Sequence, residues 1–416
     1  MTAAPAPDAG AAPAEPAGTP RPPRVRVILI HLALLALSLL LGLGVAELAV
    51  RIAAPQQLIA FRPDIWRPAD TVGYLRNGNV RARINTGERT VSVLTDAEGF
   101  RVGAAGRRDA PLTVLLLGDS FMEALQVEYE QSLAGLIEAR LPARVGTAVA
   151  VREAGIAGWD PNHYLLRARQ LLPRETFGLV VVALYAGNDL IRERIERFPP
   201  REAAERHRFG LPSSLRWSAI VESVLYPFNN VLETRSHLFV LLKKRLRAVR
   251  MRMGLSPAYV PPGVRRADAT APLWDVTADA CRDLAAAGAA RGVPTVFVLI
   301  PGPQLVDTAV LGEYVRAFRL DTLDVDFEQP HRLLPAALRA RGLRVVDALP
   351  AMRRAAAAGT PLYGRVDDHL TPQGHAVVEA AIEDTLVATL HAAPRRTAGR
   401  PRQPGGPLGQ VRGAAR

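Results

Sequence analysis

Cysteine, lysine and aromatic residues are scarce in this chain of 416 residues. The single cysteine, Cys281, excludes an internal disulfide and any metal site built from several thiolates. Lys243 and Lys244 are the only lysines, and the abundance of Ala, Arg and Pro is typical of translation from a GC-rich bacterial genome. Aromatic residues make up 6% of the chain and no basic stripe is interleaved with them, so the net charge of +12 does not predict nucleic-acid binding.

Large apolar residues are also scarce at both ends of the chain. Residues 1–25 are mostly Ala, Pro and Gly, which bury too little surface to offset the entropy of ordering, so we expect a disordered cytoplasmic leader. Residues 393–416 are rich in Pro, Gly and Arg and contain no acidic residue, which predicts a disordered basic tail. Much of the positive excess therefore belongs to the tail.

A long apolar run follows the leader. From Val27 to Ala46 nearly every residue is Leu, Val, Ile or Ala, and about 20 helical residues span about 30 Å, so residues 26–48 are expected to form a transmembrane anchor. A cleaved signal peptide is the alternative, but its apolar region is usually about 7 to 15 residues long. Arg21, Arg24 and Arg26 flank the amino-terminal side and keep it in the cytoplasm by the positive-inside rule. The sequence therefore predicts a single-pass protein of a bacterial inner membrane, with its main domain periplasmic or extracytoplasmic.

The rest of the chain divides into segments of different pattern. Residues 49–110 contain short alternating runs, and we expect a membrane-proximal cap or edge hairpin there. From 111 to 392 strand-like and helix-like segments alternate, as in a parallel sheet with crossover helices, apart from a helical insertion at about 195–272. Within the insertion, the apolar and basic run Leu238–Arg250 either contacts anionic lipid headgroups or packs on the core with a solvated basic face. Strands are expected at Leu112–Leu117, Val149–Glu153, Leu179–Leu184, Thr295–Ile300 and Leu343–Val346.

The first expected strand runs into Gly118-Asp119-Ser120, and a helical segment follows. This order places the Ser120 Oγ at the carboxyl end of a parallel strand, where open α/β sheets bind their ligands. The amino end of the following helix supplies free backbone N–H groups that can stabilise an oxyanion. Gly, Asp and Ser are also ordinary turn and N-cap residues, so this tripeptide alone is a weak signal.

A second polar segment lies near the other end of the chain, from Asp367 to His375, and leads into an apolar helix. A serine nucleophile needs a base to take its proton and an anion to orient that base, and His369 with Asp367 meets this need. Thr371 and Pro372 are also what the start of a helix requires, so the segment has a structural role in either case. We expect His375 to be structural.

Two glycine-containing segments follow the next two expected strands. Gly155-Ile156-Ala157-Gly158 comes after the second strand, and its glycines allow a backbone N–H to approach a substrate closely. Gly187-Asn188-Asp189 comes after the third strand, and the Asn188 amide can donate a hydrogen bond to a developing negative charge. Each segment alone is most often a turn, but their order at successive strand ends indicates one site.

These four segments, in this order, resemble the SGNH hydrolase family of GDSL-like lipases and acylhydrolases, named for a serine, a glycine, an asparagine and a histidine in separate blocks. The resemblance spans about Leu112 to Leu390. It implies an α/β fold, a three-layer α/β/α flavodoxin-like sandwich with a parallel sheet. It also implies an oxyanion hole formed by the Ser120 N–H, the Gly158 N–H and the Asn188 amide.

The last block departs from the pattern of many family members. These members place the acid three residues before the histidine, where this chain has Val366. The spacing from Asp367 to His369 is similar to a variant in membrane-linked members that modify bacterial exopolysaccharides. The resemblance thus implies Ser120, His369 and Asp367 as catalytic residues, with Asp368 open as the alternative acid.

The resemblance implies a serine esterase that acts on an ester-linked acyl group of an envelope glycan or another acylated molecule, with no cofactor and no metal. An O-acyltransferase with the same triad, a lipid esterase and a non-catalytic glycan-binding module are the alternatives. A metal-dependent esterase that uses Asp119, Asp189 and His375 beside the triad groups is a further rival, but neither an H-x-H nor an H-E-x-x-H spacing occurs. The sequence predicts no oligomeric state.

Overall fold

The computed structural model describes residues 24–58, 62–198, 231–253, 262–265, 271–318, 320 and 325–393. The expected leader at 1–25 and the expected tail at 393–416 lie almost entirely outside the described residues, as does much of the expected insertion at 195–272. The chain divides into two compact units, Met1–Ala54 and Pro55–Arg416.

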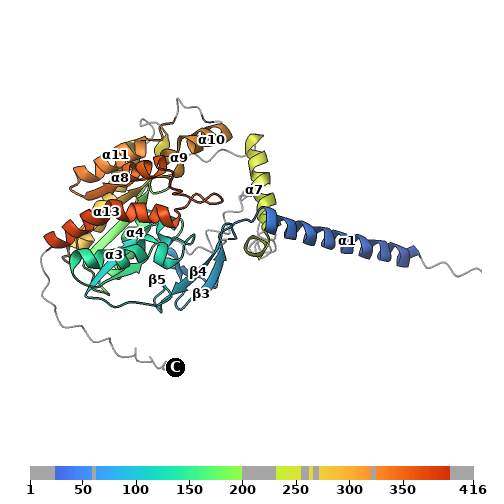
Figure 1. The fold of residues 1–416 in the computed structure, drawn as a ribbon, viewed down its shortest axis with the longest axis horizontal. Helices are drawn as coiled ribbons and strands as arrows, with labels where there is room; N and C mark the ends of the chain where they lie inside the picture. The colour runs from blue at the N-terminus through green and yellow to red at the C-terminus, as the bar shows by residue number, and fades with distance from the viewer. Residues whose placement is uncertain are drawn as a thin grey trace, which may run out of the picture. The chain divides into compact units, whose positions relative to one another are not determined.

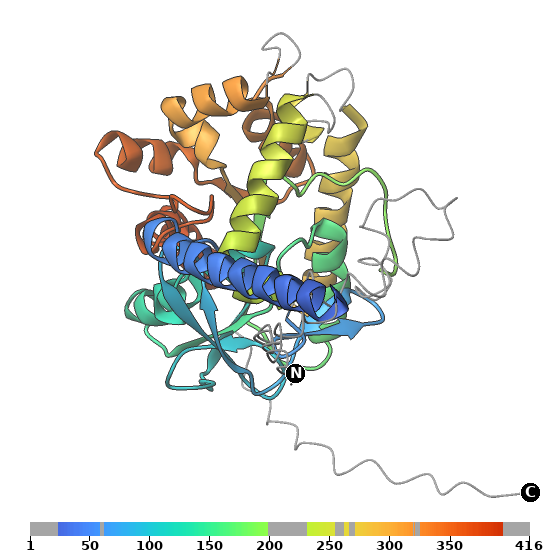
Figure 2. The ribbon, with the colours of Figure 1, turned by 90° about the vertical axis from the view of Figure 1, so that its right-hand side faces the viewer.

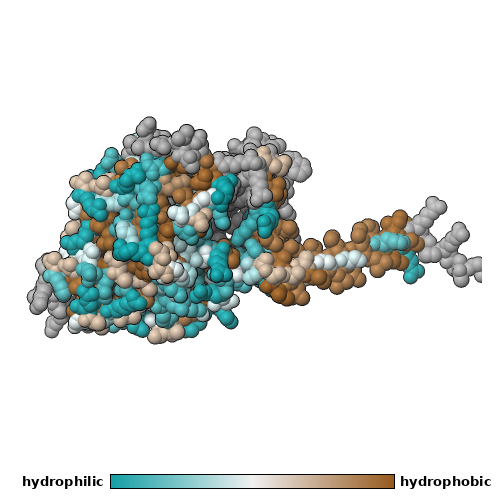
Figure 3. All heavy atoms as spheres, turned by 45° about the horizontal axis from the view of Figure 1, so that its top comes forward, coloured by the Kyte–Doolittle hydropathy of each residue, from teal (hydrophilic) through white to brown (hydrophobic). Residues whose placement is uncertain are grey.

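The first unit contains a single described helix, α1 (Arg24–Ala53), which is longer than the expected span of 26–48. Most of its side chains are apolar and exposed, including Leu40, Val45 and Ile52. Figure 3 shows hydrophobic side chains over most of the visible surface of this helix. By length and composition α1 can cross a membrane, as a membrane anchor or a signal sequence would.

Five parallel strands form the centre of the second unit. Their spatial order, with β6 first along the chain, is second, first, third, fourth, fifth, which is the flavodoxin-like order. Each strand begins and ends within one residue of its expected bounds, so the expected fold class is confirmed. From β6 the chain continues to β7 on one side of the sheet and then returns to β8 on the other side of β6. The segments that follow β6 and β8 therefore lie next to each other at the carboxyl edge of the sheet. The strands are β6 (Leu112–Leu117), β7 (Val149–Glu153), β8 (Leu179–Tyr185), β9 (Thr295–Ile300) and β10 (Arg344–Asp347).

Helices cover both faces of this sheet and make three layers (Figure 1). Side chains alternate along β6, so that Val114 and Leu116 face one layer while Leu115 and Leu117 face the other. The first face packs against α3 (Leu133–Val145), α12 (Leu349–Ala357) and α13 (Pro372–Ala392). The second face packs against α4 (Pro161–Leu171), α8 (Ala271–Ala289) and α11 (Gln329–Ala340). Burial of these apolar faces, at about 25 cal/mol per Å² removed from water, supplies the main stabilisation of the sandwich.

Antiparallel strands extend the parallel sheet beyond β7. β5 (Arg101–Val102), β4 (Thr90–Thr95) and β3 (Arg81–Asn85) follow in that order, and their blue to cyan ribbons are visible in Figure 2. β1 (Trp66–Ala69) and β2 (Gly73–Arg76) form a separate two-stranded sheet. The expected edge hairpin is therefore present as β3 and β4. Segment 49–110 is continuous with the main sheet because β5 pairs with β7 at Arg101 and Glu153.

The remaining described helices connect these layers. α2 (Ser120–Glu123) and the 3₁₀ helix η1 (Tyr129–Gln131) lead from β6 into α3. In the insertion, α7 (His237–Arg252) contains the whole of the expected run Leu238–Arg250, and its Leu242 and Leu246 are exposed. The other short helices are η2 (Pro262–Val264), α9 (Pro303–Val306) and α10 (Thr308–Phe318).

Candidate active site

Ser120 begins α2 immediately after β6, at the carboxyl edge of the sheet. Asp119 caps this short helix, because its Oδ1 accepts a hydrogen bond from the Phe121 N–H at 2.9 Å. The turn before the serine requires Gly118, since a Cβ at that position would collide with the Met122 side chain. The local sequence thus fixes the backbone that presents the half-buried Ser120 side chain.

The structure brings His369 to Ser120 across about 250 residues of sequence. The His369 Nε2 lies 2.7 Å from the Ser120 Oγ, and the His369 Nδ1 is hydrogen-bonded to the Asp367 Oδ1. The Phe121 ring packs beside the imidazole, with 4.8 Å between ring centroids. We assign the proton of the neutral ring to Nδ1, because Nδ1 faces a carboxylate. The Nε2 is then free to accept the serine proton, at a distance suited to general-base catalysis.

Asp367 is the acid that contacts the His369 ring, and two amide side chains hold it in place. Its Oδ2 accepts a hydrogen bond from the Gln126 Nε2 at 2.9 Å and another from the Gln57 Nε2. These two glutamines were missed by the sequence analysis. They lie far from the histidine block, and no local pattern marks either of them. The hydrogen bonds leave Oδ1 directed at the imidazole and orient the acid.

The charges of this pair favour an ionised acid beside a readily protonated base. Burial raises the pKa of Asp367, but the hydrogen bond and charge of His369 outweigh it, and the pKa of Asp367 is lowered overall. Burial lowers the pKa of His369, but Asp367 more than compensates, and the pKa of His369 is raised overall. The pKa of Asp368 is raised by burial and by the neighbouring Asp367 charge. Asp367 is therefore placed to stabilise an imidazolium formed during reaction.

Asn188 and Gly158 flank the serine at the ends of neighbouring strands. The Asn188 Nδ2 donates to the Asp119 Oδ2 at 3.0 Å, which fixes the amide and leaves its second N–H available. Gly158 has φ +78°, a conformation that favours glycine, and it is exposed. Within the described part of the chain, the Gly158 N–H makes no hydrogen bond. Both groups are therefore free to donate to a bound oxygen atom.

A buried ionic network holds the loop that carries Gly158. The Ala157 N–H donates to the Glu123 Oε2 at 2.8 Å, and the Gly155 N–H donates to the Glu153 Oε1 at 2.6 Å. The Gly155 carbonyl accepts a hydrogen bond from the Arg76 Nη1 at 2.8 Å. Arg76 in turn pairs with Glu153 at 2.8 Å and with Glu123 at 3.5 Å, and all three side chains are fully buried. Strand β2 is thus tied to the glycine loop.

These network residues were also missed by the sequence analysis. Glu123 lies three residues after Ser120, and an acidic residue inside an otherwise buried block is a signal that could have been used. Arg76 carries no comparable signal, because its partners are set by tertiary packing. Burial raises the pKa of Glu153 to about 7, against the opposing charge of Arg76.

Two further polar residues of the four blocks lie in the interior. Asp189 accepts hydrogen bonds from the Tyr164 hydroxyl at 2.9 Å and the Tyr185 N–H at 2.7 Å, and burial raises its pKa well above the usual value. His375 is buried in the first turn of α13, and burial lowers its pKa to about 3, so its ring is neutral. Among the residues that the structure describes, no group of three or more His, Cys, Asp or Glu side chains is arranged to hold a metal ion.

The chain was compared with known protein families, curated sequences and solved structures. A family model described as "SGNH hydrolase-like domain, acetyltransferase AlgX" matches residues 264–412. No curated protein sequence matches the chain. The structure of TesA is 15% identical, with a TM-score of 0.33, and the match covers 67% of this chain and 99% of TesA.

Two esterases are among the other similar structures. For the acetyl-xylooligosaccharide esterase Axe2 from Geobacillus, the identity is 13% and the TM-score 0.33, with 66% of this chain and 94% of Axe2 covered. For the esterase EstA from Pseudoalteromonas, the values are 12% and 0.32, with 67% and 98% covered. The family match includes the histidine block, and the strand order is the flavodoxin-like one expected for such proteins. The chain therefore has an SGNH hydrolase-like fold, and its match to the family model covers residues 264–412.

Proposed function

We propose that the protein is a serine esterase in which Ser120 is the nucleophile, His369 the general base and Asp367 the acid that orients it. One observation carries this proposal. The Ser120 Oγ lies 2.7 Å from the His369 Nε2 while Asp367 occupies the other ring nitrogen. Nucleophile, base and orienting acid in this mutual contact are the parts that acyl transfer through a serine requires.

The proposed reaction has two steps. His369 takes the Ser120 proton as the Oγ attacks the ester carbonyl carbon, and the protonated ring then gives that proton to the leaving alcohol. Water attacks the resulting acyl-enzyme, with His369 again acting as base, and releases the acid and the free serine. In both steps negative charge develops on the carbonyl oxygen, which accepts hydrogen bonds from the N–H groups of Ser120, Gly158 and Asn188. Removing one such donor typically lowers kcat by about 10² to 10³.

We place the substrate among acylated glycans of the cell envelope, outside the cytoplasmic membrane of a bacterium. Gly158 and Asn188 are both exposed, so a bulky substrate can reach the site. α1 is long and apolar enough to serve as an anchor. The matching family model carries the name of an acetyltransferase, which favours an acetyl group as the acyl group.

An O-acyltransferase with the same triad is the second candidate, and the name of the family model favours it directly. In that reaction a sugar hydroxyl replaces water in the second step, and every other group keeps its role. A lipid esterase is supported by the exposed Leu242 and Leu246 beside the basic residues of α7. A non-catalytic glycan-binding module has less support, because it does not require a base hydrogen-bonded to the serine.

Turnover of p-nitrophenyl acetate by the full chain in detergent tests the proposal. We expect Ser120→Ala and His369→Ala to reduce the rate to background, while His391→Ala, at an exposed position of α13, keeps the parent rate. A fluorophosphonate probe should label Ser120 in the parent and not in Ser120→Ala. Full turnover by Ser120→Ala, or a parent that neither turns over nor becomes labelled, would rule out the serine mechanism.

A second measurement separates hydrolysis from transfer. Acetylated donor is supplied with and without an oligosaccharide acceptor, and the products are identified by mass spectrometry. Free acetate as the main product in both cases supports the esterase. Acetylated oligosaccharide, formed with a matching loss of free acetate, supports the acyltransferase.

A further inference from the structure

A cavity of ≈ 530 Å³ at the carboxyl end of α4 is lined by arginine side chains, and we call it the arginine cavity. Its walls include Arg67, Arg167, Gln170 and Arg174. α4 begins next to Gly158 and runs for 11 residues toward this cavity. At 1.5 Å per residue, Arg167 lies about 9 Å along the helix from Pro161. None of the residues that line the arginine cavity belongs to the four segments of the proposed active site. The arginine cavity is therefore distinct from the proposed active site.

Arg167 is buried in the wall of this cavity without an anionic partner. Its side chain donates to the Gln170 Oε1 at 3.1 Å, and its Nε has no hydrogen-bond partner among the described residues. The guanidinium lies 5.8 Å from the centroid of the Phe100 ring. The ring and the carboxyl end of α4 offset part of the cost of burying the charge, but neither supplies an anion.

The other buried arginines of the described residues have more acceptors than Arg167, although the Arg101 Nε also has no hydrogen-bond partner among these residues. Arg76, Arg101 and Arg152 each donate to at least three oxygen atoms of carboxylates or backbone carbonyls. Arg167, which is only 8% exposed, has a single neutral acceptor. A buried charge that is left so incompletely paired is costly, which marks this position as unusual.

Like charges surround Arg167. The side chains of Arg67 and Arg174 are exposed, and they too have no ion-pair or hydrogen-bond partner within the part of the chain that the structure describes. Burial and, after it, the nearby charges of Arg76, Arg174 and Arg67 together lower the pKa of Arg167 to about 10. No carboxylate contributes an opposing effect. Glu98 and Glu175 line the cavity too, but Arg107 holds both of them, at 2.7 and 3.2 Å.

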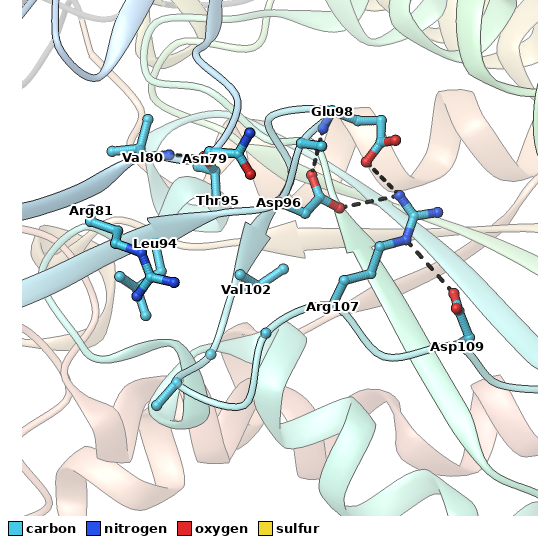
Figure 4. A pocket seen from close by; sticks show the side chains of 14 residues that line it. Asn79, Val80, Arg81, Leu94, Thr95, Asp96, Glu98, Val102, Arg107 and Asp109 are labelled. Atoms are coloured by element: carbon cyan, nitrogen blue, oxygen red, sulfur yellow. Dashed lines mark hydrogen bonds and ion pairs between the residues drawn. The ribbon is translucent and has the colours of Figure 1, made fainter.

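A neighbouring cavity of ≈ 580 Å³, lined by two arginines and three carboxylates, serves as a comparison (Figure 4). There Arg107 reaches Asp96 at 3.3 Å, Glu98 at 2.7 Å and Asp109 at 3.7 Å. Figure 4 shows these carboxylates converging on the one guanidinium. Glu98 and Arg107 line both cavities, so the ion pair between them is shared by the two cavities.

We propose that the arginine cavity binds a phosphate group, either as free phosphate or as a phosphate monoester, through Arg67, Arg167 and Arg174. Guanidinium groups match the oxygen geometry of phosphate and bind it with pairs of charge-assisted hydrogen bonds. Three unpaired positive charges suit a doubly charged oxyanion better than a single carboxylate. The volume lies in the range of small-molecule sites and exceeds what a bare phosphate fills, so the organic part of a monoester also fits.

Isothermal titration of the full chain in detergent, at low salt, tests this site with defined probes. Inorganic phosphate and glucose 1-phosphate are the two test ligands, and glucuronate and chloride are the controls. We expect a dissociation constant below about 1 mM for at least one phosphate ligand, and at least tenfold weaker binding in Arg167→Met. Arg169→Gln, at an exposed position of the same helix outside the cavity, should bind like the parent. The tighter of the two test ligands identifies the source of the phosphate.

Thermal unfolding gives an independent test, because Arg167→Met is expected to raise the melting temperature, whereas most substitutions of buried residues lower it. Without phosphate, Arg167→Met should melt at a higher temperature than the parent, because it removes a buried charge that lacks an anion. Added phosphate should raise the melting temperature of the parent and not that of the variant. If Arg167→Met does not fold, Arg174→Gln replaces it in the test, because Arg174 is exposed. We expect this variant to bind phosphate at least tenfold more weakly than the parent.

Three results would overturn the proposal. One is a parent that binds neither phosphate ligand. Another is phosphate binding that Arg167→Met or Arg174→Gln leaves unchanged. The third is glucuronate binding as tight as that of either phosphate ligand, because it would identify a carboxylate site.

Discussion

The protonation of His369 sets the pH dependence of the proposed reaction. Burial lowers the pKa of this ring, but the hydrogen bond and charge of Asp367 raise it above the ordinary 6.5. Since only the neutral ring accepts the Ser120 proton, kcat/KM should rise with pH and level off above the raised pKa. Asp367→Asn removes the charge that raises the pKa of His369 most, so we expect the midpoint of the pH profile to move to lower pH. The plateau rate should also fall by at least about 100-fold, because the amide no longer stabilises the imidazolium.

Asp368→Asn is the matched control for this experiment, because it changes the same group at the adjacent position. Asp368 is not bonded to the ring in the described structure, so its amide variant should keep the plateau rate within a few-fold of the parent. Profiles with p-nitrophenyl acetate for the three proteins decide between the two acids. A larger loss in Asp368→Asn than in Asp367→Asn would reverse the assignment.

Residues of the candidate site differ in how far the sequence could reveal them. Ser120, Gly158, Asn188 and His369 stand in short blocks at the ends of apolar strands, so pattern and strand order together predicted that they meet. Gln57 and Gln126, which bond to Asp367, have no such setting, because their contacts arise only when distant segments pack together. Local sequence therefore predicts the reacting groups better than the groups that orient them.

The loop from Gly155 to Gly158 is held by carboxylates, and this gives a prediction at the level of the element. Glu123→Gln keeps the shape of the side chain but removes its charge, which weakens its hold on the Ala157 N–H and leaves Arg76 less well paired. We expect kcat to fall by about tenfold with KM little changed, because the Gly158 N–H acts on the transition state more than on the bound substrate. Steady-state kinetics measure this split.

Thermal melting of the same variant checks the other consequence. Losing one partner of a buried ionic network is destabilising, so Glu123→Gln should melt below the parent. Glu383→Gln is the control, since its pair with Arg144 lies at the surface and such pairs contribute little. A variant with a lowered melting temperature, an unchanged kcat and an increased KM would show that the network stabilises the fold without positioning the loop.

The bounds of the strands were easier to predict from the sequence than the pairing of strands in the sheet. The five parallel strands are continuous apolar runs bounded by turns, which is what burial on both faces produces, and their bounds followed from the sequence. Short alternating runs in segment 49–110 predicted a cap or edge hairpin, and buried positions alternate with more exposed ones along β4. The place of the hairpin in the main sheet depends on the pairing of β5 with β7 at Arg101 and Glu153, which no local pattern encodes.

At the scale of the whole molecule, α1 is compatible with a membrane anchor or a signal sequence. Its 30 residues are longer than the apolar region of a usual signal peptide and carry no acidic residue in the first turn. We therefore propose that α1 stays attached as an anchor. Mass spectrometry of the protein purified from membranes should find the residues of α1 retained, and a mature protein that has lost them would show that α1 is a cleaved signal.

Orientation in the membrane follows from charge at the ends of α1. Arg21, Arg24 and Arg26 precede the apolar run, whereas Glu47 and Arg51 nearly cancel at its other end, so from the positive-inside rule we propose a cytoplasmic amino terminus. A reporter phosphatase that folds only where disulfides form, fused after Ala393, should therefore be active in intact bacteria. The same fusion without residues 1–54 should be inactive, which controls for a reporter that folds in the cytoplasm. An inactive full-length fusion, made in equal amount and bound to membranes, would place the hydrolase-like domain on the cytoplasmic side, where envelope glycans are out of its reach.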